Sequence, residues 1–446
     1  MIPRVCALTL SCMAKTYRSY CPDQLLLLPP SLRDWLPENH LAYFVADVVD
    51  QLDLSEIESY YERDDRGQPP YHPRMMTKVL VYAYCVGIFS SRKIQKRILE
   101  DVAFRILAAG NEPDFRTISD FRKIHYKALE GLFQQVLQLA LTAGAMKLGR
   151  VALDGSKIKA NASKHKAMSY RRMREEERYL RDEVRKLLNQ ARAVDDEEDA
   201  RYGKNKSGDE LPEELSRRES RLQRIREAKR ALEQRACEEA AEAGKSEQEA
   251  DRAKPGDKDQ YNFSDPESRI MKGSDGFVQA YNAQAAVEAS MQLIVGQAVT
   301  QQANDKQQIV PMVETIQQQA GQRPEQLLAD SGYCSEQNLA HLQKKKVEAY
   351  IATDRQNHGG QEVRCKRGPL PDGATRVDRM RRKLQTKAGA EIYAGRKAIV
   401  EPVFGQIKQA RGFRQFLLRG IEKVRAEWAM VCMTHNILKI YRLCCE

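Results

Sequence analysis

The chain has no long apolar run. Its 446 residues contain no stretch of 18 apolar residues, and "QLLLLPPSL" is far too short to span a bilayer. The opening "MIPRVCALTLSC" has one arginine and a brief apolar run, but no small-residue cleavage site follows it. We therefore expect a soluble protein without membrane contact. The sequence leaves translation starts at Met1 and Met13 open; it favours Met13, and a signal peptide is the less favoured alternative.

Paired cysteines are also missing. The ten cysteines are scattered, no C-x-x-C pair occurs, and Cys444 and Cys445 are adjacent. This pattern argues against a zinc knuckle and against a disulfide framework. Cys334, Cys365 and His358 could be considered as zinc ligands, but their spacing fits no known metal-binding pattern. We expect a reducing, cytoplasmic compartment.

Negative charge is scarce near the C-terminus. The whole chain has 73 Lys and Arg against 62 Asp and Glu, a net charge of +11. From Val363 to Glu446 there are 19 Lys and Arg but only 7 Asp and Glu, a local surplus of 12. A solvated basic face would give the same composition, but so local a surplus is more typical of a polyanion-binding surface.

Residues 24–145 have the pattern of helices. "TKVLVYAYCVGIF" predicts a largely buried helix, and "SSRKIQKRILED" predicts a helix with basic residues along one side. "PDFRTISDFRKIHYKALEGLFQQVLQLALTAG" predicts one long helix capped by Thr117 or Ser119. A helix-turn-helix reader and a packing domain with a basic face explain these residues about equally well. We expect a DNA-binding and dimerisation domain here, after a poorly ordered segment at 1–23.

Charged helices replace this pattern at residues 165–258. Two segments rich in Glu and Arg carry narrow apolar stripes, and a polar region separates them. The stripes consist of Met173, Leu180, Val184, Leu187 and Ala191, and of Leu215, Leu222, Ile225, Leu232 and Ala236. Such stripes predict an antiparallel coiled-coil hairpin inserted into the fold.

Strand patterns flank this insertion at 146–164 and 259–446. "RVALDGSKIKANAS" precedes it, and "GFVQAYNAQAAVE", "QLIVGQAVTQ", "RPEQLLADSGY" and "VEAYIAT" follow it, with helical segments after the third strand. Without the insertion the order is β-β-β-α-β-α-β-α. This order predicts an α/β layer with a mixed sheet flanked by helices.

Three acids occupy positions typical of an α/β active site. Asp154 and Asp330 are each expected at the end of a strand, where sites gather in open α/β sheets. Glu401 lies alone in the basic helical segment "AGRKAIVEPVFGQIKQARGF", where a carboxylate weakens the attraction for phosphate. Taken singly, such an aspartate is usually a turn residue, and such a glutamate is usually solvated.

The combination resembles a known family. "LDGSKIKANAS", "LLADSGY" and "YAGRKAIVEPVFGQIKQARGF" are similar to segments of the DDE transposases of bacterial insertion sequences. The similarity is greatest to the branch with a tyrosine-arginine-glutamate-lysine signature. "YHPRMMTKVLVYAY", "PDFRTISDFRK" and "SDPESRIMKGSDGFVQAYNAQAAV" support it, so that it covers nearly everything from about residue 25 to 440 except the hairpin. It implies an RNase H-like fold for 150–440.

The resemblance assigns the acids. Asp154, Asp330 and Glu401 match the three catalytic acids of the family and are the expected metal ligands. They would hold two Mg²⁺ ions, with Asp154 bridging both, and Mn²⁺ should substitute. Two such ions activate the attacking water or 3′-hydroxyl and stabilise the leaving oxygen.

The resemblance also assigns cations around Glu401. Tyr393, Arg396 and Lys408 match the remainder of the signature, and four residues separate Arg396 from Glu401 where the signature has three. Lys397 stands at the three-residue distance, so either cation can take the role of the signature arginine. The expected DNA contacts are Tyr393, Arg396, Lys397, Lys408 and Arg411.

The implied function is that of a DNA transposase. It would bind double-stranded DNA at the terminal inverted repeats as a homodimer, cleave the element ends and transfer a 3′-hydroxyl to target DNA. A metal-dependent nuclease without strand transfer would use the same acids, so only a joining assay separates the two. A domesticated or inactive DNA-binding protein is the other alternative. We expect the protein in the bacterial cytoplasm, associated with the nucleoid.

Overall fold

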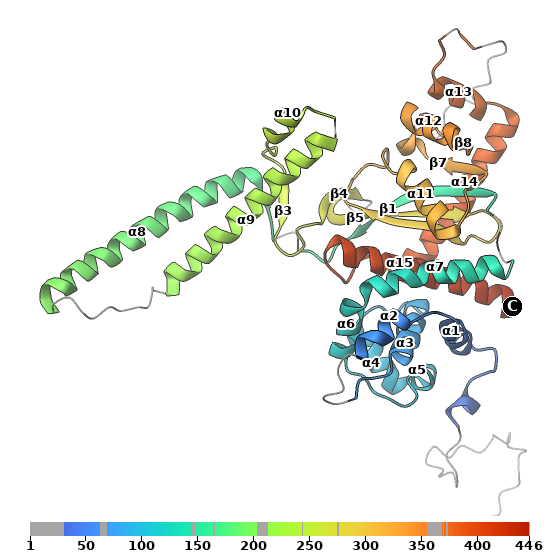
Figure 1. Cartoon of the computed structure of the whole chain (residues 1–446), viewed down its shortest axis with the longest axis horizontal. Coiled ribbons are helices and arrows are strands. Elements are labelled where there is room, and N and C mark those ends of the chain that lie inside the picture. The colour runs from blue at the N-terminus through green and yellow to red at the C-terminus, as the bar shows by residue number, and fades with distance from the viewer. Residues whose placement is uncertain are drawn as a thin grey trace, which may run out of the picture.

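The computed structural model comprises an N-terminal helical part, an α/β layer and a pair of long helices that extends away from them (Figure 1). It describes residues 31–62, 69–144, 146, 148–163, 166–202, 213–242, 244–273, 276–354, 368, 370–371 and 373–445. The segment 1–23, predicted to be poorly ordered, lies outside these residues. None of the described helices is long and apolar enough to cross a membrane.

Helices form the part of the chain before the first strand. After a 3₁₀ turn at Leu32–Trp35 they are α1 (Leu41–Asp50), α2 (Ser55–Tyr61), α3 (Pro73–Cys85), α4 (Ser91–Glu100), α5 (Val102–Leu107), α6 (Phe115–Ile124) and α7 (Tyr126–Thr142). The buried helix predicted from "TKVLVYAYCVGIF" is α3, in which every residue from Met75 to Cys85 except Lys78 is buried. The predicted helical N-terminal part is therefore confirmed.

The prediction of one long helix after residue 114 is wrong. The side chain of Asp114 caps α6 by accepting from the backbone N–H groups of Arg116 and Thr117, at 2.6 and 2.9 Å. The helix ends before His125, whose backbone is not helical (φ −97°, ψ 19°). The His125 ring is held by the Tyr61 hydroxyl at 3.0 Å, and this tertiary contact accompanies the break.

The sheet is mixed, as predicted. Its central strand β1 pairs antiparallel with β5 and parallel with β7, which pairs parallel with β8, while β4 and β6 both pair antiparallel with β5. The bounds are β1 (Arg150–Lys159), β4 (Arg269–Gly273), β5 (Gly276–Glu288), β6 (Ile294–Thr300), β7 (Gln326–Ala329) and β8 (Glu348–Ile351). The sequence analysis missed β4, because only one of its side chains, that of Met271, is buried.

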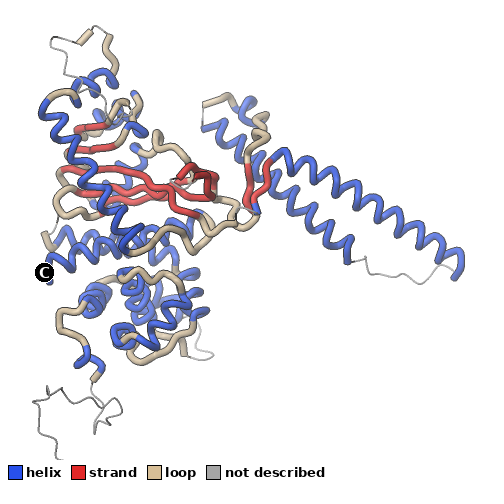
Figure 2. Tube along the Cα trace, turned by 180° about the vertical axis from the view of Figure 1, so that it is seen from behind, coloured by secondary structure: helices blue, strands red, loops and turns tan. Residues whose placement is uncertain are grey.

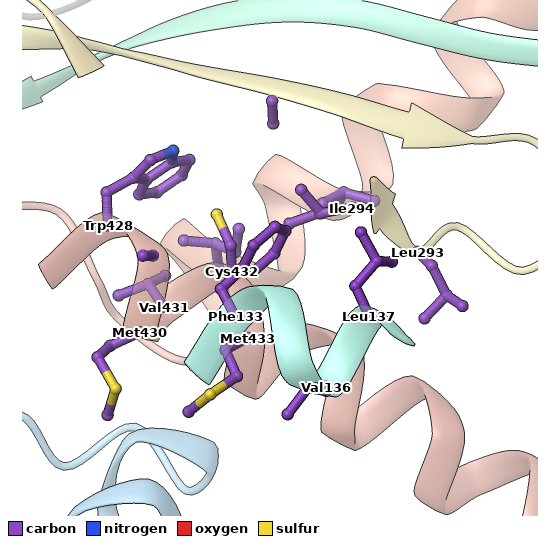
Figure 3. Close-up of a cluster of buried hydrophobic side chains, with 14 of the residues drawn as sticks. Phe133, Val136, Leu137, Leu293, Ile294, Trp428, Met430, Val431, Cys432 and Met433 are labelled. Carbon is purple, nitrogen blue, oxygen red and sulfur yellow. The ribbon is translucent and has the colours of Figure 1, made fainter. Parts of the chain in front are cut away.

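Helices cover the sheet and join it to the N-terminal part. They are α11 (Ile309–Ala320), α12 (Glu336–Lys344), α13 (Arg376–Leu384), α14 (Lys387–Gly405) and α15 (Ile421–Cys445). Figure 1 shows α7 and α15 side by side between the sheet and helices α1–α6. Phe133 and Leu137 of α7, Ile294 of β6, and Trp428 and Val431 of α15 gather in one buried cluster (Figure 3). The helical part and the sheet therefore share a continuous hydrophobic core.

The inserted segment forms two long helices that lie side by side. The chain runs outward along α8 (Tyr170–Tyr202) and returns along α9 (Glu213–Glu242), followed by the short α10 (Glu247–Asp251) (Figure 2). At the base of the pair, β2 (Ala167–Ser169) pairs antiparallel with β3 (Gln260–Asn262). The side chains of Ala191 and Leu215 lie outside the described residues, and coiled-coil packing stays a prediction.

The helical pair has a small core of its own. This cluster is separate from the main core and consists of Tyr170, Met173, Leu180, Leu222, Ile225, Ala228 and Leu232. At its centre, the buried Glu177 of α8 accepts from Lys229 of α9 at 3.1 Å. The two helices therefore stabilise one another without using the sheet.

We expect the α/β layer to fold without the helical pair. Replacing residues 170–258 with a short Gly/Ser linker keeps β2 and β3 and removes α8, α9 and α10, which contribute no residue to the main core. The truncated protein should stay soluble and keep a cooperative thermal transition and an α/β circular-dichroism spectrum, measured beside the full chain. An insoluble product, or loss of the strand signal, would show that the pair belongs to the main core.

Candidate active site

The register of two parallel strands brings Asp154 and Asp330 together. Leu153 of β1 lies opposite Ala329 of β7, so the residues that follow them, Asp154 and Asp330, occupy adjacent positions. β7 ends at Ala329, and Asp330 follows it as predicted. The neighbouring positions of two carboxylates therefore follow directly from backbone pairing.

Asp154 does not end its strand, and that prediction is wrong. β1 continues to Lys159, because β5 pairs with it from Val151 to Lys159, with Asp154 opposite Ala285. Asp154 thus lies in the middle of a long strand, next to the point where the shorter β7 stops.

The environment disfavours the charged form of Asp154. The pKa of Asp154 is raised to about 6: burial is the largest cause, Arg396 opposes it, and the nearby carboxylates of Asp330 and Asp305 contribute to the rise. The guanidinium Nη1 of Arg396 lies 3.5 Å from Asp154 Oδ2, and the backbone N–H of Gly155 donates to Oδ1 at 2.8 Å. One cation therefore offsets only part of the cost of this half-buried charge.

The environment also disfavours the charged form of Asp330. Burial raises the pKa of Asp330, and the charge of Asp305 adds to the rise. The backbone N–H of Gly332 donates to Asp330 Oδ1 at 2.9 Å and, with Arg396, lowers the pKa. Two adjacent carboxylates that repel one another in a half-buried site can bind a further cation favourably.

Helix α14 presents Tyr393 and Arg396 to the two aspartates. Arg396 is only 8% exposed, and its Nε has no hydrogen-bond partner among the described residues. Burial raises the pKa of Tyr393, and the charges of Asp330 and Asp154 contribute to the rise. Tyr393 and Arg396 of the signature thus lie at the site, but the guanidinium of Arg396 faces the carboxylate of Asp154 rather than solvent.

Lys408 also reaches this site. Its ammonium donates to the hydroxyl of Ser156, which lies on the same face of β1 as Asp154. Burial lowers the pKa of Lys408, and the charge of Asp154 opposes that effect. Lys408 Nζ lies 5.9 Å from the centre of the Phe404 ring. A half-buried ammonium beside the aspartates is well placed for a negatively charged ligand.

A local irregularity precedes Lys408 in the chain. Pro402 lies inside α14, where it has no N–H to donate to the carbonyl of Ala398. The side chain of Gln292 donates to that carbonyl instead, at 3.0 Å. The helix then widens into a π-helical turn at Gln406–Ala410, which contains Lys408.

Glu401 does not join the aspartates. Its carboxylate is exposed and forms no hydrogen bond or ion pair with any described residue. An α-helix turns by about 100° per residue, so Glu401 lies about 140° around α14 from Arg396, which faces Asp154. With three intervening residues instead of four, the acid would lie only about 40° away. The exposed Lys397 is separated from Glu401 by three residues and therefore lies about 40° from it around the helix.

Arg411 is not a DNA contact, and that prediction is wrong. Its guanidinium is buried against α15, where it donates to Thr434 Oγ1 at 2.8 Å and to the carbonyl of Val431 at 3.0 Å. Burial lowers the pKa of Arg411 to about 10. The chain turns at Gly412, which has a left-handed backbone (φ 74°), so Arg411 points into the core instead of continuing the basic helix face.

Asp305 is a residue near the site that the sequence analysis missed. It lies between β6 and α11, and its charge contributes to the raised pKa of both Asp154 and Asp330. The only signal in the sequence is an acid shortly after a strand, which is common in loops. Within the described residues, no group of three His, Cys, Asp or Glu side chains is arranged to hold a metal ion.

Two family models match the chain. Residues 30–124 match a family described as a transposase domain (DUF772), and residues 248–437 match the transposase DDE domain. No curated protein and no solved structure matches. Asp330 and Glu401 lie in the second match, whereas Asp154 lies between the two, before the helical pair. A transposase DDE domain implies an RNase H-like fold, with which the mixed sheet and its flanking helices agree. The chain is thus similar to a transposase domain over one segment and to the transposase DDE domain over a later one, and these two matches support a DDE transposase.

Proposed function

We propose that the chain is the DNA transposase of a bacterial insertion sequence. It binds the terminal inverted repeats, cleaves DNA at the element ends and transfers the 3′-hydroxyl to target DNA. The observation that carries this proposal is the adjacent, half-buried pair Asp154 and Asp330 in a chain that matches a transposase DDE domain. The basic C-terminal part supplies charges for a polyanion.

The donor set of this pair fits a divalent cation. Two carboxylates with water and substrate phosphate are a common coordination set for Mg²⁺, and Mn²⁺ accepts the same ligands. When bound, two such ions would activate the attacking oxygen and stabilise the leaving one. We propose Asp154 and Asp330 as ligands. Glu401 matches the third acid of the family but does not lie with the aspartates in this structure, so α14 would have to rearrange before its exposed carboxylate could act as the third ligand. Arg396 would keep Asp154 in place.

A cleavage and joining assay tests this function. The protein is incubated with Mg²⁺ and DNA from the ends of its element, and the products are sequenced. We expect cuts at the ends and joined products with the wild type, but neither with Glu401→Gln. That variant should bind end DNA in EDTA at least as tightly as the wild type, because one negative charge is removed.

The outcomes separate the alternatives. Cutting without joining would favour a metal-dependent nuclease, and binding without cutting would favour an inactive DNA-binding protein. Much weaker binding of Glu401→Gln in EDTA would mean that the carboxylate is structural. A different acid would then have to complete the metal site.

Lys408, beside the aspartates, and Arg411, buried against α15, should differ in DNA binding. Lys408→Ala should lower the slope of log K against log salt by about 0.9, the value for one phosphate contact on duplex DNA. Arg411→Met should leave the slope unchanged, because its guanidinium is buried against α15. Titrations by fluorescence anisotropy at several salt concentrations measure both. Equal slopes for Lys408→Ala and the wild type would remove Lys408 from the DNA contacts.

The other parts of the chain have proposed roles in the complex. Exposed cations on α4, including Lys93 and Lys96, suit DNA binding by the N-terminal helices. The helical pair α8 and α9 would contribute protein or DNA contacts in a homodimer on paired ends. We propose that this complex acts in the cytoplasm, on the nucleoid.

A further inference from the structure

Asp305 is the acceptor at the centre of a buried polar network. Its Oδ1 accepts from Asn282 Nδ2 at 2.7 Å and from Gln284 Nε2 at 2.8 Å. Lys157 Nζ lies 3.4 Å from the same oxygen. Asn282 and Gln284 are both 0% exposed. A carboxylate with donors arranged in this way fixes the orientation of the side chains that donate to it.

The Asp305 network lies on the opposite face of β1 from Asp154. Side chains alternate along a strand, so Gly155 and Lys157 share one face, and Asp154 and Ser156 share the other. Lys157 contacts Asp305, whereas Asp154 and Ser156 contact residues of α14 and the turn after it. Asp305 is therefore placed to act on the site through its neighbours rather than beside Asp154.

The path from Asp305 to the site runs through Gln284. Because Gln284 Nε2 donates to Asp305, its Oε1 faces the other way and accepts from the hydroxyl of the fully buried Tyr333. Tyr333 closes the 3₁₀ turn that begins directly after Asp330. This is the turn whose Gly332 N–H donates to Asp330 Oδ1. The orientation of one amide thus links Asp305 to the carboxylate of Asp330.

A second connection ties the same two loops together. The side-chain amide of Asn338 donates to the carbonyl of Lys306 at 2.6 Å and to the carbonyl of Tyr333 at 2.8 Å. Gln284 thus connects the side chains of Asp305 and Tyr333, and Asn338 connects the backbone next to Asp305 with the backbone of Tyr333. The turn after Asp330 is fixed relative to the loop after β6.

Gly155 makes room for this network. It lies opposite Gln284 in the antiparallel pairing of β1 and β5. A Cβ at Gly155 would lie 2.8 Å from Asp305 Oδ1 and 2.9 Å from Asn282 Oδ1, and it would overlap the Gln284 amide. Any other residue at 155 would displace the groups that orient Tyr333. The absence of a side chain next to Asp154 therefore serves the positioning of Asp330.

We propose that Asp305 is a positioning residue for Asp330. By accepting from Gln284 it holds the amide in the orientation that binds Tyr333, which fixes the turn carrying the metal-binding carboxylate. The catalytic part of this inference rests on the proposed transposase function. The structural part does not, because it concerns only the order of the turn at 331–333.

Two substitutions at one position test the proposal. Asp305→Asn retains an oxygen that accepts from Gln284 and loses the charge, whereas Asp305→Ala loses both. We expect Asp305→Ala to weaken Mn²⁺ binding in the presence of end DNA, and to slow cleavage, by about 10–100-fold, as for other residues that orient ligands. Asp305→Asn should stay within about threefold, because it keeps the hydrogen bonds and loses only the partly exposed ion pair with Lys157.

Hydrogen exchange supplies a measurement independent of activity. In Asp305→Ala, amide exchange should become faster in peptides covering 330–335 and stay unchanged in β8. Glu314→Ala is the matched control, because Glu314 is exposed on α11 and has no hydrogen bond or ion pair with described residues. If Asp305→Ala does not fold, Tyr333→Phe removes the same link from the other end and should show the same local exchange.

Two results would overturn the proposal. If Asp305→Asn is as inactive as Asp330→Asn, the charge of Asp305 acts directly, as a ligand would. If exchange at 330–335 is the same in wild type, Asp305→Ala and Tyr333→Phe, the network does not hold the turn. Failure of the wild type to cut or join DNA would refute the proposed function only, since the exchange comparison is made without DNA.

Discussion

Asp330→Asn should reduce DNA cleavage by on the order of a thousandfold or more, because several kcal/mol of charge stabilisation by the metal ions depend on their ligands. The amide oxygen of asparagine can still accept from the Gly332 N–H, so the turn should persist. Binding of end DNA in EDTA should stay close to that of the wild type. The cleavage rate with Mg²⁺ and the Kd without it are the two measurements.

The same substitution should stabilise the metal-free protein. Burial and neighbouring charge raise the pKa of Asp330 in the folded state, so the folded state binds its proton more tightly than the unfolded state does. The wild type therefore loses stability as the pH rises from the ordinary value of 3.8 through the raised pKa. Asparagine avoids this loss, and its advantage should appear at neutral pH and vanish below about pH 3.8.

Thermal unfolding in EDTA at several pH values tests this expectation. Glu314→Gln serves as the control, since it removes an exposed acid of α11 that has no partner among the described residues. A lower Tm of Asp330→Asn at pH 7 would show that the carboxylate is a structural ion-pair partner. Retained cleavage in Mg²⁺ would remove Asp330 from the metal site.

Trp428→Ala should cost about 3–5 kcal/mol of unfolding free energy, as expected for a large aromatic side chain removed from a core. Trp428 is fully buried and stacks on Phe404 of α14, with ring centroids 6.3 Å apart and an interplanar angle of 11°. Its Nε1 donates to the carbonyl of Gln284 in β5 at 3.0 Å. One side chain thus joins α15 to α14 and to the sheet beneath the candidate site.

The second tryptophan provides a matched control. Trp35 is 60% exposed, so Trp35→Ala should change stability by less than about 0.5 kcal/mol. Trp428→Phe keeps an aromatic ring and loses the hydrogen bond, so it should cost on the order of 1–2 kcal/mol. Urea unfolding followed by far-ultraviolet circular dichroism measures all three. Equal stabilities of Trp428→Ala and Trp35→Ala would show that the contact with α14 contributes little.

Much of the fold could be predicted because its signals are local. Apolar spacing in α3 and the alternating strand patterns arise within single elements, and the structure contains all five predicted strands. β4 escaped prediction because burial of Met271 alone gives no alternation. The helix break at His125 was not predicted, because it is accompanied by a contact with Tyr61, which is distant in sequence.

The candidate site likewise has some features that the sequence predicts and others that depend on tertiary contacts. Asp154 and Asp330 could be named from their residue types and strand context, but their adjacency depends on the parallel register of β1 and β7. No local pattern reveals Asp305, since its partners lie on β1 and β5. Contacts between distant segments determine both features, and a single sequence does not contain them explicitly.

The sequence alone determined the charge of the C-terminal part, the helical periodicity of α14 and the presence of one acid among its cations. Only the tertiary structure decided which of these side chains faces the aspartates. Arg396 faces Asp154, Arg411 turns into the core against α15, and Glu401 stays exposed. The reason is that periodicity fixes the angles between side chains on a helix, whereas packing against β1 and α15 sets the rotation of the whole helix.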